Sequence, residues 1–258
     1  MKIFVLVKEV PDTYGDRKLN LETGLADRAA GDVVLDEITE RALEVALSYA
    51  DKNDGTEVVA VSMAPAGSTA SVRRALAIGA GSAVHIADEQ LAGADLGLTA
   101  EVLAAAIRRG APDLVITGNL STDGSGGVLP AMLAEHLGFA QATALTSVEI
   151  TADGVSGVRG ADAGGQPVSA PLPAVISITE ALPDARFPNF KGIMAAKKKP
   201  LEVLSLADLD VSADPASAPR TIMTTVSEKP PRAAGVKIVD EGDAADKLVE
   251  YLVQNRLV

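Results

Sequence analysis

The sequence contains no cysteine and no tryptophan, and only two of its 258 residues are histidine. The absence of cysteine excludes disulfides, thiolate nucleophiles, cysteine-ligated zinc and iron–sulfur clusters. Neither His85 nor His136 has a second histidine or an aspartate at the spacing of a metal site, so we expect both to be structural or solvated. Any redox chemistry must therefore come from a bound organic cofactor.

Basic residues and long apolar runs are also scarce. The chain has 23 lysines and arginines against 35 acidic residues, a formal net charge of −12. A nucleic-acid surface needs an excess of positive charge, so we expect no nucleic-acid partner. The longest uncharged stretch, 163–179, contains three prolines and two glycines, and the first apolar run, 3–7, is too short for a signal peptide. We expect a cytoplasmic protein without membrane insertion.

Short apolar segments alternate with amphipathic segments over the first 137 residues. Strands are predicted at 3–7, 57–63, 83–86 and 113–117, and helices at 36–52, 71–78, 97–109 and 127–137. Asp36 is a plausible N-cap of the first helix, and Gly79 ends the second. Strand–helix alternation predicts an α/β fold, a doubly wound and mostly parallel sheet with helices on both faces.

The pattern changes after residue 137. Segments rich in Val, Thr and Ser predict further strands at 143–150, 153–159 and 174–179, some of them antiparallel, which extend the sheet or form a flap on it. A strand-like segment at 201–206 is followed by a Pro-, Ala- and Ser-rich stretch at 211–233 and a helical segment at 243–258. We therefore predict an α/β domain over 1–200 and, over 201–258, a linker with an extended arm that packs on a partner.

The loop after the strand at 113–117 is the richest candidate for a ligand site. It reads GNLSTDGSGG at 118–127, directly before a helix with Pro130 in its first turn. Small residues let a phosphate approach the backbone, where N–H groups and the helix dipole favour an anion. The loop is neither a Walker A motif nor a dinucleotide fingerprint. The loop could be a phosphate site or an ordinary tight turn. Lys8, Glu9 and Asp12, which follow the first strand, could contact a ligand or be ordinary surface charges.

A second candidate is the segment 182–199, LPDARFPNFKGIMAAKKK. Its five basic residues and one acid give a net charge of +4 within a chain of −12, and it holds two of the seven aromatic residues, Phe187 and Phe190. Exposed aromatic rings among basic residues are typical of a docking site, where a ring is buried and charges steer the partner. A solvated lysine run at a helix end, with both rings folded inward, fits the composition equally well.

Three segments together resemble one family: MKIFVLVKEVPDT at 1–13, the Gly/Ser loop at 118–128, and ARFPNFKGIMAAKKK at 185–199. The chain resembles, over essentially its whole length, the β subunit of electron-transfer flavoproteins, which has a Rossmann-like adenine-nucleotide-binding fold. The family's signature is matched by Arg159, Asp162, Gln166, Val168 and Pro173–Ser177, with Ala163 as a departure. Further departures are Gly160, where many members have an acid near the flavin, Val33–Leu35, where many have Asn-Pro, and a phosphate loop whose usual acids are reduced to Asp123.

The resemblance implies an electron carrier that is not an enzyme and has no catalytic residues or metal. With an FAD-binding α subunit it would accept electrons from flavoprotein dehydrogenases, such as the acyl-CoA dehydrogenases of fatty acid oxidation, and pass them to a membrane quinone oxidoreductase or another acceptor. The FAD would be shared with the α subunit, and AMP or a second FAD would lie in the β subunit. One alternative is a nucleotide-binding regulatory module of the universal-stress type. Another alternative is an enzyme that activates a carboxylate with ATP. Such an enzyme would need an SGGxDS segment after the first strand, and this sequence has no such segment there.

The resemblance also assigns residues to two sites. The nucleotide site takes Leu6, Val7, Ala64, Ala66, Ser68, Gly118, Asn119, Ser121, Asp123, Gly124, Ser125, Gly126, Gly127 and Val128. The site that docks dehydrogenases is a recognition loop over 182–199 with Phe190 as its apolar anchor. The docking residues are Arg186, Phe187, Phe190, Ile193, Met194, Lys197, Lys198 and Lys199.

Overall fold

The computed structural model describes residues 1–162, 164–214, 221–232, 234–235 and 237–258. These residues form two units, Met1–Thr224 and Thr225–Val258. The predicted family departure at Ala163 lies outside the described residues, as do residues 215–220 and 233 of the predicted linker.

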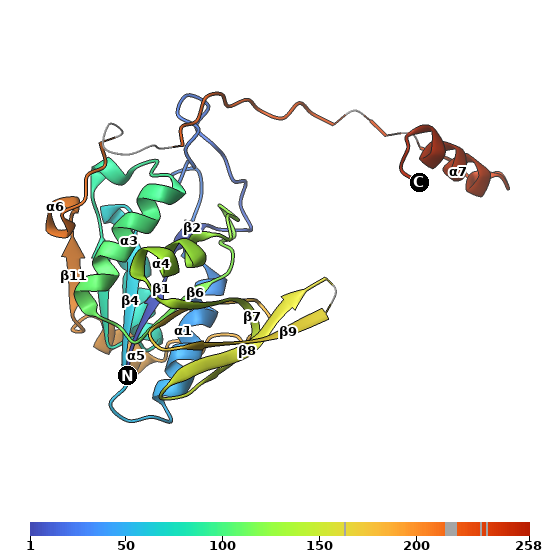
Figure 1. Ribbon diagram of the computed structural model, residues 1–258. Helices are drawn as coiled ribbons and strands as arrows, with labels where there is room; N and C mark the ends of the chain where they lie inside the picture. The colour runs from blue at the N-terminus through green and yellow to red at the C-terminus, as the bar shows by residue number, and fades with distance from the viewer. Residues whose placement is uncertain (163, 215–220, 233, 236) are drawn as a thin grey trace. The chain divides into compact units, whose positions relative to one another are not determined.

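The first unit is built on a nine-stranded sheet (Figure 1). Its strands are β1 (Lys2–Leu6), β4 (Glu57–Met63), β5 (Ser82–Ile86), β6 (Leu114–Gly118), β7 (Ala140–Ile150), β8 (Gly154–Ala161), β9 (Gly164–Pro171), β10 (Ala174–Ile178) and β11 (Leu201–Leu204). The order across the sheet is β11-β5-β4-β1-β6-β10-β7-β8-β9. All pairs from β11 to β7 are parallel, whereas β8 and β9 are antiparallel. The predicted doubly wound, mostly parallel α/β fold is confirmed.

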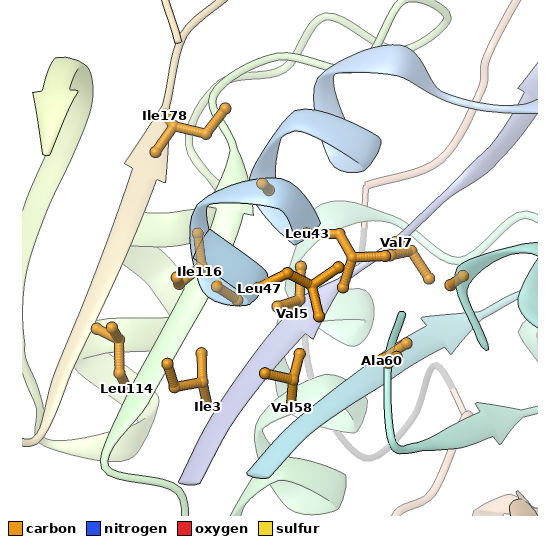
Figure 2. Close-up of a cluster of buried hydrophobic side chains, with 14 of the residues drawn as sticks. Ile3, Val5, Val7, Leu43, Leu47, Val58, Ala60, Leu114, Ile116 and Ile178 are labelled. Atoms are coloured by element: carbon orange, nitrogen blue, oxygen red, sulfur yellow. The ribbon is translucent and has the colours of Figure 1, made fainter. Parts of the chain in front are cut away.

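Helices cover both faces of this sheet. They are α1 (Glu37–Ala50), η1 (Ala66–Ser68), α2 (Thr69–Ile78), η2 (Glu89–Leu91), α3 (Leu96–Gly110), α4 (Leu129–Leu137), α5 (Phe190–Ala196) and α6 (Leu206–Leu209). Successive strand residues point to opposite faces, so Ile3 and Val5 pack with α1 and α2 while Phe4 and Leu6 pack with α3 and α4. Figure 2 shows Leu43 of α1 among the strand side chains of the hydrophobic core that contains Ile3 and Val5.

The parallel part of the sheet gives way to an antiparallel hairpin at a bulge in β7. Its register with β10 shifts between Ile176 and Ile178, and Ala144 has a φ of 56°. The Ala144 N–H donates to Ser177 Oγ at 2.8 Å, which holds the turned backbone in place. Beyond this point β7 pairs with β8, and the hairpin of β8 and β9 extends away from the helices (Figure 1). The predicted strands at 143–150 and 153–159 are present, while β9 was not predicted.

Three further elements differ from the sequence prediction. A small hairpin of β2 (Glu9–Pro11) and β3 (Val33–Leu35) closes the loop 12–32. The segment predicted as a strand over 201–206 ends at Leu204, because Ser205 and Asp208 form a capping box that starts α6. Since β11 pairs with β5, the first unit runs on to Thr224, past the boundary predicted at residue 200.

The second unit contains the predicted C-terminal helix, which the structure places at α7 (Ala244–Gln254). None of its residues is buried, and its exposed apolar side chains include Leu248, Val249, Tyr251 and Val253. Across the described parts of the chain, no helix has the length and apolar character needed to cross a membrane.

Candidate functional site

Three neighbouring parallel strands, β4, β1 and β6, end at one edge of the sheet and bring the predicted nucleotide-site residues together. Leu6 ends β1 and Val7 follows it, the segment Ala64–Ser68 follows β4, and the loop 118–128 begins at Gly118, the last residue of β6. Leu6, Val7 and Ser68 are buried, so a ligand at this edge can meet them only through their backbones. This edge is where open α/β sheets bind ligands.

Side chains from distant segments hold the loop 118–128. The Lys8 Nζ donates to Asp123 Oδ1 at 2.7 Å and to Ser121 Oγ at 3.2 Å. Arg17, from the loop 12–32, donates to the carbonyl of Thr122. Arg28, from the same loop, lies 3.8 Å from Asp123 Oδ2. Lys8 therefore holds the loop 118–128, and the next residue, Glu9, is buried.

Glu9 accepts hydrogen bonds of 2.6 Å from the hydroxyls of Ser68 and Ser71. These bonds tie the start of β2 to the start of α2. Ser68, predicted as a ligand residue, therefore uses its hydroxyl within the protein, and it can meet a nucleotide only through its backbone.

Asp36 has a role that the sequence did not reveal. It precedes α1 as predicted, but its side chain does not cap that helix. Its Oδ2 instead accepts the Thr122 N–H at 2.9 Å, across 86 residues of sequence. The side chain is buried, with a residue exposure of 1%, and its Oδ1 has no hydrogen-bond partner among the described residues.

The two carboxylates at this edge differ in protonation behaviour. Burial raises the pKa of Asp36 above its usual range, against the opposing effect of the Thr122 and Ile38 N–H groups. Burial also acts to raise the pKa of Asp123, but the hydrogen bonds from Lys8, Ser121 and Gly124 outweigh it, and the pKa is lowered. Asp123 is therefore a paired anion, and its charge is compensated before any ligand arrives.

The end of the loop nearest α4 is open. The backbone N–H groups of Gly126, Gly127 and Val128 have no partner among the described residues, and Val128 gives α4 no side-chain cap. A Cβ at Gly126 would have its nearest neighbour at 3.6 Å, whereas Gly127 has a φ of +67° and a Cβ there would lie 2.7 Å from Leu120. Gly127 is needed for the turn, and the unpaired N–H groups before a helix can bind an anion.

The predicted docking segment 182–199 lies elsewhere, against α1 and α2. Phe187 and Phe190 are 89% and 80% exposed, so the alternative in which both rings fold inward is wrong. Ile193, Met194, Lys197 and Lys198 are exposed as well. Seven of the residues expected to be a loop form α5, which begins after Asn189 because its side chain accepts the Gly192 N–H. Arg186 and Lys199 are only partly exposed, and their charged groups bind α1 and α2.

The family-signature residues lie on the β8–β9 hairpin (Arg159, Asp162, Gln166 and Val168) and on β10, which contains Ala174–Ser177. Arg159 and Gln166 face each other across the two strands, and the Arg159 Nε donates to the carbonyl of Thr143 at 2.9 Å. A Cβ at Gly160 would lie 2.9 Å from a methyl group of Thr146, so an acidic residue there would require Thr146 to move.

The two histidines lie in different surroundings. His85 is buried in β5, and its Nε2 lies 3.0 Å from the carbonyl oxygen of Ala64, so its predicted structural role is confirmed. His136 is exposed near the end of α4. In the described portion of the chain, no three acidic or histidine side chains are grouped as metal ligands.

Comparison with known proteins identifies the family. The sequence model of the electron transfer flavoprotein domain matches residues 23–209. The chain is 44% identical to the electron transfer flavoprotein subunit beta of Mycobacterium bovis, with 99% of both chains covered, and 31% identical to that of Bacillus subtilis, with 98% and 96% covered. It is 28% identical, over the full length of both chains, to a subunit of the caffeyl-CoA reductase-Etf complex of Acetobacterium woodii. The chain therefore belongs to the electron transfer flavoprotein family.

Proposed function

We propose that this chain is the beta subunit of an electron transfer flavoprotein and that it carries electrons together with an FAD-binding alpha subunit. The observation that carries the proposal is the similarity to named beta subunits along 99% of both chains. When bound, FAD supplies the redox chemistry by accepting and releasing electrons. This chain contributes binding, orientation and docking.

The surface for the alpha subunit includes the second unit, Thr225–Val258. Its helix α7 presents Leu248, Val249 and Val253 without burying any of them. An amphipathic helix gains most of its stability from packing its apolar face. We therefore expect the apolar face of α7 to be buried against the alpha subunit.

We further propose that AMP, or a second FAD, binds through its phosphate at the N-terminus of α4. The site fits such a group in three respects. The N–H groups of Gly126 to Val128 are free to donate, and Gly126 leaves the backbone approachable. The free Oδ1 of buried Asp36 can accept a hydrogen bond from a hydroxyl group. Asp123 does not oppose an anion strongly, because Lys8 and Arg28 pair with it.

The electron donors that we propose are flavoprotein dehydrogenases, including acyl-CoA dehydrogenases, and the acceptor is a membrane quinone oxidoreductase or another acceptor. The exposed rings of Phe187 and Phe190 and the exposed Lys197 and Lys198 of the same segment support a docking surface of this kind. One buried ring can supply most of the affinity of a small transient interface.

Co-expression with an alpha subunit tests the assembly. Size-exclusion chromatography should yield a yellow one-to-one heterodimer, and a chain shortened before α7 should form it less well. Acid extraction should release AMP or FAD in addition to the FAD of the alpha subunit. A colourless chain that does not bind its alpha subunit would contradict the proposed function, whereas a yellow heterodimer without a second nucleotide would contradict only the site at α4.

A further inference from the structure

The segment 182–199 is tied to the rest of the molecule at both of its ends. We propose that Arg186 and Lys199 are positioning residues, which hold the docking face of this segment in the geometry that a partner dehydrogenase binds. The inference rests on the proposed docking function. It divides the charged residues of the segment into those that build the face and those that meet the partner.

Arg186 anchors the N-terminal part of the segment on α1. Its Nε and one terminal nitrogen each donate at 2.8 Å to a different oxygen of Glu44, and its backbone N–H donates to the same carboxylate at 3.0 Å. The guanidinium also binds Asp51 at 2.8 Å. The Glu44 side chain is only 14% exposed. Paired N–H···O bonds of this kind specify orientation as well as supplying energy.

A second arginine supports the same end. Arg41 of α1 donates to the carbonyl of Leu182 and pairs with Asp184. Two consecutive turns of α1 therefore hold the chain just before Phe187, whose ring is left in solvent.

Lys199 anchors the C-terminal end of the segment on α2. Its Nζ donates to the carbonyl oxygens of Leu76 at 2.8 Å, Gly79 at 3.3 Å and Ala80 at 2.6 Å. These carbonyls lie in the last turn of α2 and just beyond it, where the helix leaves acceptors unsatisfied and its dipole favours a cation. Partial burial lowers the pKa of Lys199. Its charge is thus used within the protein, unlike those of Lys197 and Lys198.

The helix α5 between the anchors packs closely on α2. A Cβ at Gly192 would lie 2.6 Å from the carbonyl oxygen of Ala77, so the two backbones meet without an intervening side chain. Arg73 of α2 also donates to the carbonyl of Ala196 at 2.9 Å. The face that remains exposed carries Phe190, Ile193 and Met194.

A docking face that is already ordered loses less conformational entropy when a partner binds. Loosening either anchor should therefore weaken docking although neither Arg186 nor Lys199 meets the partner. The complementary surface on the dehydrogenase is an apolar pocket for Phe190 with acidic groups near Lys197 and Lys198.

The test compares Lys199→Met with Lys197→Met and Arg186→Gln with Arg186→Lys, all in the complete heterodimer. Amide hydrogen exchange should become at least about tenfold faster in 182–199 for Lys199→Met and Arg186→Gln, while the central strands exchange as before. Lys197→Met should leave exchange unchanged, and Arg186→Lys should restore part of the protection. Steady-state assays with a panel of flavoprotein dehydrogenases should show a KM for the heterodimer raised about tenfold in the two loosened variants, with kcat unchanged.

Two results would overturn the proposal. One is equal exchange in 182–199 for the parent protein, Lys199→Met and Arg186→Gln. The other is faster exchange with no rise in KM. If the parent heterodimer accepts electrons from none of the dehydrogenases, the proposed docking function fails instead, and the exchange rates alone decide whether the two residues anchor the segment.

Discussion

Charged side chains hold both the loop 118–128 and the segment 182–199, but these side chains are placed differently relative to the surface proposed to bind a ligand or partner. In the loop, Lys8 and Asp36 bind Asp123 and Thr122, close in sequence to the N–H groups that we propose as the phosphate site. In the segment, Arg186 and Lys199 bind α1 and α2, away from the exposed rings. The structure of the loop and its ligand site are therefore coupled, whereas the docking face can change without disturbing its anchors.

The largest effect that this comparison predicts is on docking. Phe190→Ala should weaken the apparent affinity for a partner dehydrogenase by about 10- to 100-fold, because burial of one ring contributes about 1.5–3 kcal/mol and about 1.4 kcal/mol corresponds to a decade. The melting temperature should not change, since the ring is 80% exposed in the free chain. Electron-transfer kinetics and a thermal melt measure both. Phe187→Ala is the matched control, and an equal or larger loss there would refute Phe190 as the anchor.

In the loop, stability and binding should change together. Gly127→Ala should lower the free energy of unfolding by about 1–2 kcal/mol, because an L-residue is strained at its φ of +67°. Gly126→Ala, whose new Cβ meets nothing closer than 3.6 Å, should be nearly neutral for folding. Urea unfolding and extraction of bound nucleotide are the two measurements. Equal stability of the two variants would show that the turn does not depend on Gly127.

Lowering the pH should change the stabilising contributions of Glu44, which holds the docking segment, and Asp36, which holds the loop, in opposite directions. Burial acts to raise the pKa of Glu44, but its bonds from Arg186 lower it overall, so its stabilisation is present at neutral pH and is lost as the pH falls through this lowered value. The difference in unfolding free energy between the parent and Glu44→Gln should be on the order of 1 kcal/mol at pH 7 and should vanish once the pH is below the lowered pKa of Glu44.

Asp36 is the opposite case. Its pKa is raised chiefly by burial, so protonation favours the folded state as the pH falls toward the ordinary aspartate value. Asp36→Asn should remove this gain from the pH profile of stability. Unfolding curves at several pH values measure the contributions of Asp36 and Glu44 to stability. If acid changed both contributions in the same direction, the comparison would be contradicted.

The smallest effect concerns the free lysines. Lys197→Met and Lys198→Met should each slow association with a dehydrogenase by about two- to fivefold at low salt, because charges at the rim of an interface steer encounter more than they hold the complex. Dissociation should be unchanged, and the difference should disappear as salt is added. Stopped-flow mixing at several ionic strengths measures it, and a slower rate that persisted at high salt would argue for direct contact.

Much of the fold was predictable because its signals are local. Apolar runs such as Ile3–Val7 and Leu114–Thr117, alternating with helical patterns, predict a parallel sheet with two covered faces. The Gly/Ser loop was predictable for the same reason, since its small residues directly follow a strand and precede a helix. β9 was not predicted, because its glycines and prolines are typical of turns, and neither was the hairpin of β2 and β3, whose strands have only three residues each.

By itself, then, the sequence determined the fold class, the place of the glycine-rich loop and the unusual composition of the docking segment, since each depends on residues close together in the chain. Only the tertiary structure decided how the charged residues are used. Asp36 reaches Thr122 across 86 residues, and Lys199 reaches α2 across about 120. Within one run of three lysines, only Lys199 finds unsatisfied helix carbonyls within reach, and no local pattern distinguishes it from its neighbours. Pairing between distant groups depends on where the folded backbone brings them, and this is why these roles required the structure.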